Sequence, residues 1–369
     1  MIWTMKIYFL THNLKQDNGA GVFSARLIQG VQDALKCEVT ALTTVPSGVA
    51  YEHAILYPNK FKLLMSLPRI RTLLKGADVI HALDAFPYGM IAVIGAFGLQ
   101  KKIIITAAGS GSILPLYHWF HAPFMRFIYR HARMITAISN YTKQEILKKI
   151  PNLMIQVINH GVDSDRFRGD GTHYATNRYK PYILSVGQLR WRKGYHFSIR
   201  SFAAIAPEFP DIHYVIVGKK YKQDYYERLQ VLIDELKLRN RVHILEDVDT
   251  HEKLADVYTN AELFCLFSQN MNYDVEGFGL VFLEAAAAGL PVVGAKNCGI
   301  DDAVLEGKNG LLVETRSPDD FAAAIAAILR DPEKKKKMAA ASILFAEKSQ
   351  WKERIAQYIA LYRVILETR

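Results

Sequence analysis

The stretch Val275–Gly294, VEGFGLVFLEAAAAGLPVVG, predicts both a fold and a ligand site. Glu276 precedes a Gly-Phe-Gly turn, Glu284 lies eight residues later in an Ala-rich helical run, and a buried strand follows Gly289. Glycines let backbone N–H groups approach a ligand closely, and the helix N-terminus behind the turn favours negative charge. A diphosphate on the amides, with a carboxylate on either side to hold hydroxyl groups, describes a nucleotide-sugar site.

Short buried strands alternate with amphipathic helical segments on both sides of this stretch. The strands predicted in the first half are Lys6–Leu10, Val39–Thr43, Val79–Ala82, Ile103–Thr106, Met134–Ile138 and Ile155–Ile158. Those predicted in the second half are Tyr182–Val186, His213–Val217, Val242–Leu245, Leu263–Phe267, Pro291–Val293 and Leu311–Val313. The clearest helices are Val22–Leu35, Tyr195–Ile205, Tyr225–Leu236 and Trp351–Glu367. Such alternation is typical of parallel sheets with helices on both faces.

The polar segment Asp163–Tyr179 interrupts this alternation, and we interpret it as an interdomain linker. The predicted fold class is therefore α/β, with two Rossmann-like doubly wound domains that face each other across a cleft. The predicted domains are residues 1–165 and residues 180–345, and a carboxy-terminal helix within 346–369 is expected to pack back toward the first domain. Ligands of such sheets bind beyond the carboxyl ends of the strands, which predicts a site in the cleft.

The whole-chain composition narrows the classes of partner. The chain has 369 residues, of which 50% are hydrophobic, and a formal net charge of +10. This charge favours anionic partners, but no nucleic-acid-binding module is recognisable, so nucleic acid is not expected. Cys37, Cys265 and Cys298 are far apart and typical of buried thiols in a reducing cytosol. No signal peptide or membrane-spanning run is evident, so we expect a cytoplasmic protein, soluble or peripheral at the inner face of the membrane.

Seven motifs then occur in an order shared with one enzyme family. They are the glycine loop that ends at Gly21, DVIHA at Asp78–Ala82, TAISNYTKQEI from Thr136, VINHGVD at Val157–Asp163, SVGQLRWRKG at Ser185–Gly194, YVIVG at Tyr214–Gly218, and the Glu276–Glu284 segment. In this order they resemble the retaining glycosyltransferases of the GT-B fold, specifically glycosyltransferase family 4 (glycosyl transferases group 1). The resemblance covers most of the chain.

The resemblance implies roles for the residues of the opening stretch. Glu276 is expected to contact the donor sugar, and Glu284 is expected to hold the ribose hydroxyls. The backbone of Phe278, Gly279 and Leu280 is expected to contact the sugar and the phosphates.

The resemblance also implies a cationic contribution to the donor site. Lys193 is expected to neutralise the donor diphosphate, and Gly21 to let a backbone amide reach the phosphates. The family usually carries an arginine at the position of Gln188, and either Arg190 or Arg192 could supply that charge. Gln188 and Arg190 are therefore included in the predicted donor site, and Glu276 and Lys193 are the predicted catalytic residues.

We expect no cofactor, and no metal requirement. Asp163–Asp165 and Asp247–Asp249 are Asp-x-Asp pairs of the kind that can bind a divalent metal, but neither lies in a context that fits a metal site. Lys193 and the helix N-terminus can neutralise the diphosphate instead. The family tends to place a histidine near the transferred sugar, in the loop that reads TAAGSGS here, where this chain has Ala108.

Two stretches of the first domain combine basic and apolar residues. Lys60–Gly76 carries five basic residues and no acid, and Pro68 is predicted to break it into two pieces. Leu116–Met134 combines aromatic residues with three arginines. Each fits either a membrane-facing segment or a core-facing helix with a solvated basic face. Their occurrence in the domain expected to receive the acceptor favours an anionic membrane surface as a partner.

The favoured function is a retaining hexosyltransferase that moves a sugar from a nucleotide-diphosphate donor to a lipid-linked or glycan acceptor. We expect the enzyme to act in cell-surface polysaccharide or glycolipid synthesis. We favour a UDP-sugar as the donor, because UDP-sugars are frequent donors in the family. The alternative is a catalytically weak or inactive GT-B scaffold that binds a nucleotide sugar or glycan, which Gln188 and Ala108 motivate. A GT-B epimerase or phosphorylase would need additional acid/base carboxylates or a cofactor lysine, and no such motif is visible.

Overall fold

The computed structural model describes residues 5–15, 18–170, 172, 174, 176–271, 274–314 and 317–367. The chain forms two compact units, the first from residues 1–160 with 351–369, and the second from residues 161–350. The sequence placed the corresponding boundaries at 165, 180 and 345. Each unit contains one parallel sheet with helices packed against it, and this confirms two Rossmann-like α/β domains.

The first unit has a seven-stranded parallel sheet in the order β3-β2-β1-β4-β5-β6-β7. Its strands are β1 (Lys6–Thr11), β2 (Glu38–Thr43), β3 (Glu52–His53), β4 (Val79–Ala82), β5 (Lys102–Ala107), β6 (Met134–Ala137) and β7 (Ile155–Val157). Its helices are α1 (Gly19–Leu35), α2 (Lys60–Lys75), η1 (Ala85–Gly89), α3 (Met90–Gly95), α4 (Ser110–Tyr117), α5 (Ala122–His131), α6 (Asn140–Lys149) and α13 (Trp351–Glu367).

The central strand β1 is buried from Ile7 to Thr11, as expected for a parallel strand that is covered on both faces of its sheet. Ile7 lies opposite Val39 of β2 and opposite Val79 of β4, and all three side chains are buried. A strand enclosed in this way needs a continuous apolar run, which is the pattern that the sequence shows.

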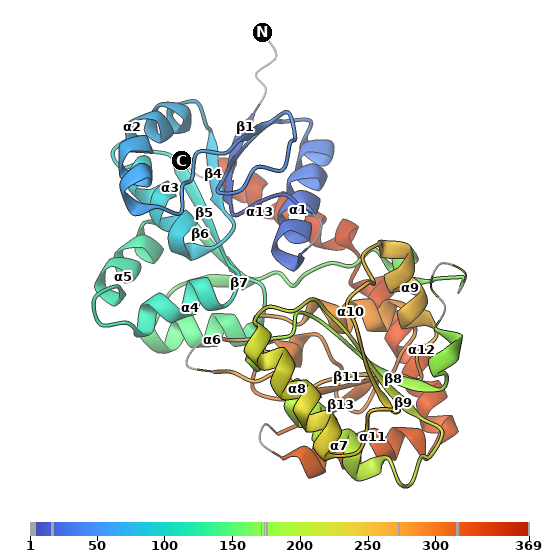
Figure 1. Ribbon diagram of the computed structural model, residues 1–369. Helices are drawn as coiled ribbons and strands as arrows, with labels where there is room; N and C mark the ends of the chain where they lie inside the picture. Colours follow the sequence, from blue (N-terminus) through green and yellow to red (C-terminus); the bar gives the residue numbers. More distant parts are fainter. Residues whose placement is uncertain are drawn as a thin grey trace. The chain divides into compact units, whose positions relative to one another are not determined.

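The last helix, α13, completes the core of the first unit. It lies beside α1, as the red and blue helices in Figure 1 show. Buried hydrogen bonds fix it to the sheet: the Tyr362 hydroxyl lies 2.6 Å from Nδ1 of His81, and Nε2 of His81 lies 2.7 Å from Oγ1 of Thr106. Burial lowers the pKa of His81 to about 3, so the imidazole is neutral and its two nitrogens serve as one donor and one acceptor.

The basic stretch of the first unit corrects one sequence-based expectation. Pro68 was predicted to split Lys60–Gly76 into two pieces, but α2 is a single helix with Pro68 inside it. A proline in a helix leaves the carbonyl four residues earlier without its N–H partner. That carbonyl belongs to Leu64, whose residue is 61% exposed, so water can reach this part of the helix.

The second unit has a six-stranded parallel sheet in the order β10-β9-β8-β11-β12-β13. Its strands are β8 (Tyr182–Val186), β9 (His213–Val217), β10 (Val242–Leu245), β11 (Leu263–Leu266), β12 (Val292–Ala295) and β13 (Gly310–Val313). Its helices are η2 (Ser164–Phe167), η3 (Asn177–Tyr179), η4 (Trp191–Lys193), α7 (Tyr195–Ile205), α8 (Gln223–Glu235), α9 (His251–Thr259), α10 (Leu280–Ala287), η5 (Gly299–Asp302), α11 (Pro318–Leu329) and α12 (Pro332–Lys348).

The strand order reverses direction between two central strands in each sheet. In the second unit the reversal lies between β8 and β11, and in the first unit it lies between β1 and β4. Open α/β sheets bind their ligands beyond the carboxyl ends of the strands at such a switch point. Within the described residues, no helix is long and apolar enough to cross a membrane.

A candidate donor site in the second unit

Two loops meet at the switch point of the second unit, one after β8 and one after β11. Gly194 has a φ of 66°, and a Cβ on it would lie only 1.9 Å from the carbonyl oxygen of Phe267. Only glycine permits both this backbone conformation and this approach. The backbone N–H of Gln269 also donates to the carbonyl oxygen of Arg192 at 2.7 Å. The two loops are thereby held together, and the residues around Gly194 are brought to the end of β11.

Three side chains converge on one carboxylate oxygen at this point. Oε2 of Glu276 lies 2.6 Å from Nζ of Lys193 and 2.9 Å from Nη1 of Arg192. The Ser268 hydroxyl donates to the same oxygen at 3.1 Å. Burial would raise the pKa of the Glu276 carboxyl, but the charges of Lys193 and Arg192, with hydrogen bonds from Lys193 and Ser268, outweigh it and lower the pKa to about 2. Glu276 is therefore ionised at neutral pH, although its residue is only 8% exposed.

The structure distinguishes the two arginines that the sequence left as alternatives. Arg192 lies within the cluster: its side chain is 14% exposed, and its Nε is 3.4 Å from Oδ1 of Asp274 as well. Arg190 instead stacks on Tyr221, with its Cζ 3.7 Å from the ring centroid. Gln188 is exposed. Arg192 is thus the second cation beside Lys193.

The Gly-Phe-Gly turn shapes the start of α10. Gly279 has a φ of 83° and stands at the N-cap position, where no side chain among the described residues caps the helix. Phe278 is 3% exposed and Leu280 is partly buried. The N–H of Gly299 donates to the carbonyl oxygen of Glu276 at 2.7 Å, which holds the turn against η5. A helix N-terminus left open in this way carries partial positive charge.

Glu284 lies further along α10 in a different environment. The Tyr258 hydroxyl donates to its Oε2 at 2.9 Å. Burial raises the pKa of Glu284 to about 7, while the hydrogen bond from Tyr258 and the charges of Lys193 and Arg166 act in the opposite direction. The residue as a whole is partly buried, and the raised pKa means that its carboxyl titrates near neutral pH.

Gly21 belongs to the first unit, where its surroundings explain why it is glycine. It is buried in the first turn of α1, and a Cβ on it would lie 1.8 Å from the carbonyl oxygen of Lys15. Its N–H donates to Oδ1 of Asn18 at 2.9 Å, which caps the helix. The Gly21 amide itself is therefore engaged in a helix cap.

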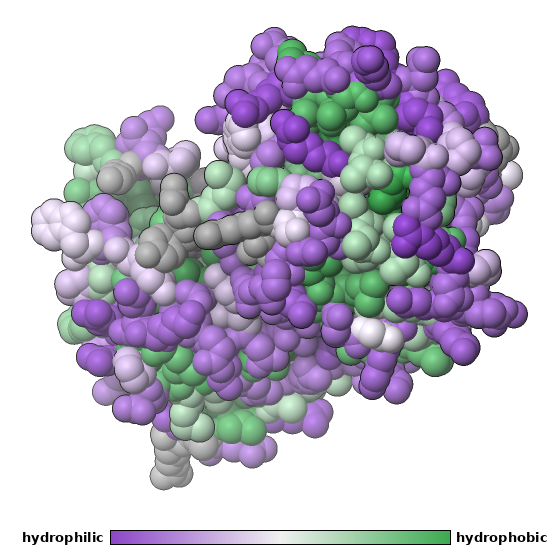
Figure 2. All heavy atoms as spheres, turned by 90° about the horizontal axis from the view of Figure 1, so that it is seen from below, coloured by the Kyte–Doolittle hydropathy of each residue, from purple (hydrophilic) through white to green (hydrophobic). Residues whose placement is uncertain are grey.

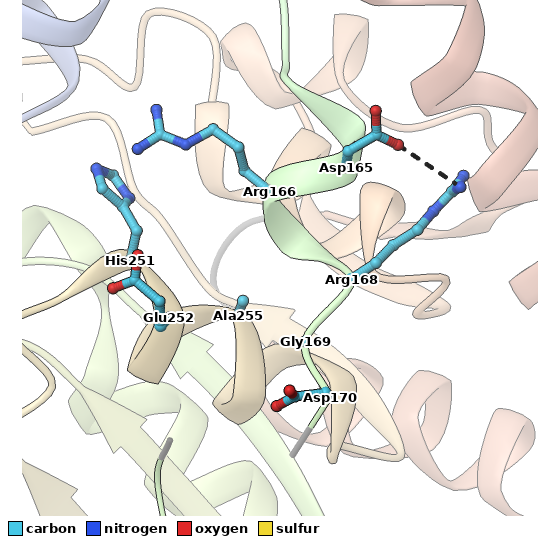
Figure 3. Close-up of a pocket in the computed structure, with 8 residues that line it drawn as sticks. All are labelled: Asp165, Arg166, Arg168, Gly169, Asp170, His251, Glu252 and Ala255. Carbon is cyan, nitrogen blue, oxygen red and sulfur yellow. Dashed lines mark ion pairs between the residues drawn. The ribbon is translucent and has the colours of Figure 1, made fainter. Parts of the chain in front are cut away.

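A surface pocket lies between η2 and α9 of the second unit and has a volume of about 280 Å³. Figure 3 shows that Arg166 extends to the opposite side from Asp165 and Arg168, which pair with each other at 3.8 Å. The charge of Arg166 acts to lower the pKa of Glu284, against the larger effect of burial. The lining residues are Asp165, Arg166, Arg168, Gly169, Asp170, His251, Glu252 and Ala255.

The Asp-x-Asp pairs lie among basic and hydroxyl groups. Asp163 is 3.7 Å from Arg166, and Asp249 is 2.8 Å from Lys253. The Tyr174 hydroxyl donates to Asp247 at 2.8 Å. Within the described ranges, no three histidine, cysteine or acidic side chains are placed to hold a metal ion.

Sequence reasoning missed three residues of the site, namely Ser268, Tyr258 and Arg166. Ser268 had a usable signal, because it comes almost directly after a predicted strand. Tyr258 and Arg166 had none: Tyr258 reads as one apolar position of a helix, and Arg166 as part of a polar linker. η2 packs against both α9 and α10, and this packing brings Tyr258 and Arg166 toward Glu284.

Comparison with known proteins places this geometry in a family. Residues 173–344 match the model described as Glycosyl transferases group 1, and residues 17–166 match Glycosyltransferase Family 4. A GDP-mannose-dependent alpha-(1-6)-phosphatidylinositol monomannoside mannosyltransferase of Mycolicibacterium smegmatis is 27% identical over 81% of each chain. A D-inositol 3-phosphate glycosyltransferase of Corynebacterium urealyticum is 32% identical over 57% of this chain and 51% of its own.

Solved structures share the fold. Sucrose-phosphate synthase from Thermosynechococcus elongatus superposes with a TM-score of 0.82 at 20% identity, covering 99% of this chain and 100% of that one. Anabaena HepE in complex with UDP has a TM-score of 0.77 at 21% identity, covering 98% and 100%. With both halves matched in order by family models and both sheets arranged as in GT-B proteins, the chain belongs to the group 1 glycosyltransferases of the GT-B fold, of the family 4 type.

Proposed function

We propose that this glycosyltransferase moves a hexose, with retention of configuration, from a nucleoside diphosphate sugar to a lipid-linked or glycan acceptor. The observation that carries the proposal is the convergence of Lys193 and Arg192 on Glu276 at the switch point of the second unit. Lys193 and Arg192 bring two positive charges to one point, against the buried carboxylate of Glu276 and the half-exposed carboxylate of Asp274, which lies 3.4 Å from Nε of Arg192. The relatives that act on phosphatidylinositol mannoside and inositol phosphate support a role in glycolipid synthesis.

In this proposal the donor phosphates bind Lys193 and Arg192 alongside Glu276, which keeps its ion pairs with them. The open N-terminus of α10, at Gly279 and Leu280 behind Phe278, supplies further positive potential. As the bond between the sugar and the diphosphate breaks, negative charge grows on the leaving diphosphate, and fixed cations stabilise it more in the transition state than in the ground state. No metal is required for this neutralisation.

Glu276 acts on the sugar in this scheme, as a hydrogen-bond acceptor for its hydroxyl groups. Its low pKa makes it a poor base, and its ion pairs make it a poor nucleophile. Retention is then best served by substitution on one face of the sugar, in which a donor phosphate oxygen takes the proton of the acceptor hydroxyl. The proton leaves with the nucleoside diphosphate.

Glu284 is assigned to the ribose, because it is a partly buried acid of α10 whose Oε2 accepts the Tyr258 hydroxyl at 2.9 Å. We expect a UDP-sugar, and the UDP complexes of Anabaena HepE support that choice for this fold. The mycobacterial relatives are named for GDP-mannose, so guanosine diphosphate and its sugars are tested beside the uridine donors.

Thermal shift with a panel of nucleoside diphosphates and their sugars tests the donor site, because a ligand that binds the native state raises its melting temperature. We expect UDP or GDP to stabilise the wild-type protein and not Lys193→Ala, with EDTA having no effect. A shift that needs added Mg²⁺, or no shift with any nucleotide, would contradict the proposal.

The first unit carries a face that suits an anionic membrane. Residues 53–144 contain eleven lysines and arginines and two acids, a net +9 of the chain's +10. Of the two acids, Asp78 accepts the backbone N–H of Lys6 and Asp84 is largely enclosed by hydrogen bonds. Large apolar side chains are exposed on the same segment: Phe61, Leu64, Met65, Phe97, Trp119, Phe120, Phe124 and Phe127.

Parts of this segment that are distant in sequence lie together. Phe97, just after α3, is 6.5 Å from Phe127 of α5 between ring centroids, and Arg71 of α2 donates to the carbonyl oxygen of Phe97 at 2.7 Å. Hydrophobic side chains also surface in several groups among hydrophilic ones on the face in Figure 2, so exposed apolar groups alone define no docking face. The docking surface is instead defined by exposed apolar side chains together with basic residues and very few acidic ones.

We therefore propose a cytoplasmic enzyme that binds the anionic inner leaflet of the membrane through this segment. Sedimentation with phosphatidylglycerol vesicles should retain the protein at low salt, and binding should weaken in Trp119→Ser/Phe120→Ser. Vesicles of phosphatidylcholine alone are the control, and equal binding to both would contradict the proposal.

The second candidate function is a binding protein without turnover, favoured by the exposed Gln188 and by Ala108. It predicts nucleotide-sugar binding with no release of nucleoside diphosphate under any acceptor condition. Release of nucleoside diphosphate that depends on an added acceptor would favour the enzyme over the binding protein.

A further inference from the structure

The loop after β11 places a second carboxylate beside the cations of the candidate donor site. Asp274 lies two residues before Glu276, and its Oδ1 is 3.4 Å from Nε of Arg192. Two backbone hydrogen bonds hold Asp274 to Met271. The N–H of Asp274 donates to the carbonyl oxygen of Met271 at 2.8 Å, and the N–H of Met271 donates to the carbonyl oxygen of Asp274 at 2.9 Å. The backbone that carries this carboxylate is thereby fixed close to Arg192.

Asp274 and Glu276 contact Arg192 in different ways. Oε2 of Glu276 lies 2.9 Å from Nη1 of Arg192, and the two side chains are only 11% and 14% exposed. The Asp274 side chain is 51% exposed, and its 3.4 Å ion pair is longer than an ordinary N–H···O hydrogen bond. Asp274 therefore acts on Arg192 through its charge more than through a directed hydrogen bond.

The formal charges of this four-residue cluster cancel. Lys193 and Arg192 contribute two positive charges. Glu276 and Asp274 contribute two negative charges. Asp274 is the member whose charge can be removed without leaving a buried cation unpaired, because Arg192 keeps its ion pair with Glu276. Its contribution to the site is therefore separable by mutation from the buried ion pairs.

A cluster with cancelled charges holds a diphosphate less tightly than the same cations with one acid fewer. A nucleoside diphosphate carries several negative charges, and the Asp274 carboxylate repels each of them while Lys193 and Arg192 attract them. Because Asp274 is half exposed, water and salt weaken this repulsion without removing it at low ionic strength. The same repulsion favours departure of the nucleoside diphosphate after the sugar has been transferred.

We propose that Asp274 offsets the charge of Arg192, so that the donor site holds a nucleoside diphosphate less tightly and releases it more readily as product. The inference rests on the proposed function, because it takes Lys193 and Arg192 as the cations that receive the diphosphate. Asp274 contacts no reacting atom in this scheme and acts only through the electrostatic field at the cations.

Isothermal titration calorimetry of the full chain with UDP and with GDP tests this inference. Asp274→Asn removes the charge and keeps the shape of the side chain, and it should tighten nucleoside diphosphate binding about three- to tenfold at low salt. Asp274→Ala should show a similar gain, and the gain should shrink between about 50 mM and about 500 mM NaCl. Asp211→Asn is the matched control, since Asp211 is exposed just before β9, at the opposite end of the same sheet. It should bind as the wild type does.

Two further measurements separate an effect of charge from a structural one. Uridine and guanosine carry no phosphate, so Asp274→Asn should bind them as the wild type does. Inhibition of sugar transfer by added nucleoside diphosphate should strengthen by the same factor as binding. Unchanged or weaker diphosphate binding in Asp274→Asn, an equal gain for the nucleosides, or unchanged inhibition would each overturn the inference and leave the donor site standing. Absence of UDP and GDP binding to the wild-type protein would instead overturn the donor proposal, and this inference with it.

Discussion

The two sheets of this protein have the same strand order around their switch points and opposite chemistry there. At the end of β8 and β11, Lys193 and Arg192 surround an ionised carboxylate. At the end of β1 and β4, Nδ1 of His12 instead lies 3.2 Å from the hydroxyl of Tyr88. The shared strand order therefore gives each sheet a switch point, whereas a few loop side chains set the chemistry found there. The following changes test this contrast.

Removal of the central cation should have the largest effect. Lys193→Ala is expected to reduce transfer about 10³-fold, because an interaction aimed at the leaving diphosphate is lost in the transition state. Glu276→Ala should abolish transfer similarly while the protein remains folded. Steady-state kinetics with circular dichroism measure both effects. Lys222→Ala, an exposed lysine of the same unit, is the matched control. Wild-type rates in either site variant would remove these residues from the donor site.

The two arginines on either side of Trp191 should differ. Arg192→Ala is expected to weaken nucleoside diphosphate binding about ten- to hundredfold, since a partly buried cation beside Lys193 is lost. Arg190→Ala, which removes a cation stacked on Tyr221 at 3.7 Å, should change binding little. Isothermal titration calorimetry compares the pair, and the reverse ranking would assign the charge to Arg190.

Glu284 should make nucleotide binding depend on pH. Its pKa is raised to about 7, and only the ionised carboxylate can accept hydrogen bonds from two ribose hydroxyls. Affinity should therefore be full above pH 7 and fall by up to about tenfold per pH unit below it. Glu284→Gln should flatten this profile between pH 5.5 and 8. A wild-type profile without an inflection in that range would argue against ribose contact.

The smallest effect is expected at the turn before α10. Gly279→Ala places a side chain at φ 83° and brings its Cβ to 3.0 Å from Ile300. We expect a loss of about 1–2 kcal/mol in the free energy of unfolding, the typical cost of a left-handed conformation for a residue other than glycine. Urea denaturation measures it. Gly307→Ala, with a φ of 71° and no neighbour within 4 Å, isolates the backbone contribution from the contact with Ile300.

Much of the fold could be predicted because each strand needed only a local signal. β4, β8, β9 and β10, with helix α7, have the predicted bounds, since apolar runs between turn residues identify buried parallel strands. The two-residue β3 gave no such signal, and α2 was predicted as two pieces because a proline normally ends a helix. Local sequence patterns could not show that Pro68 lies in an exposed part of α2, where the loss of one helical hydrogen bond is tolerated.

The sequence by itself determined two α/β domains and the candidate trio Glu276, Glu284 and Lys193, because strand periodicity and glycine turns are written in neighbouring residues. Only the tertiary structure decided that Arg192 and not Arg190 joins Lys193, that Tyr258 holds Glu284, and that Tyr88 holds His12. These contacts join residues that are 26 positions apart, for Tyr258 and Glu284, to 84 positions apart, for Arg192 and Glu276. Hydrogen bonds and ion pairs act over a few ångströms in space, so their partners are settled by the packing of the sheets and helices that carry them.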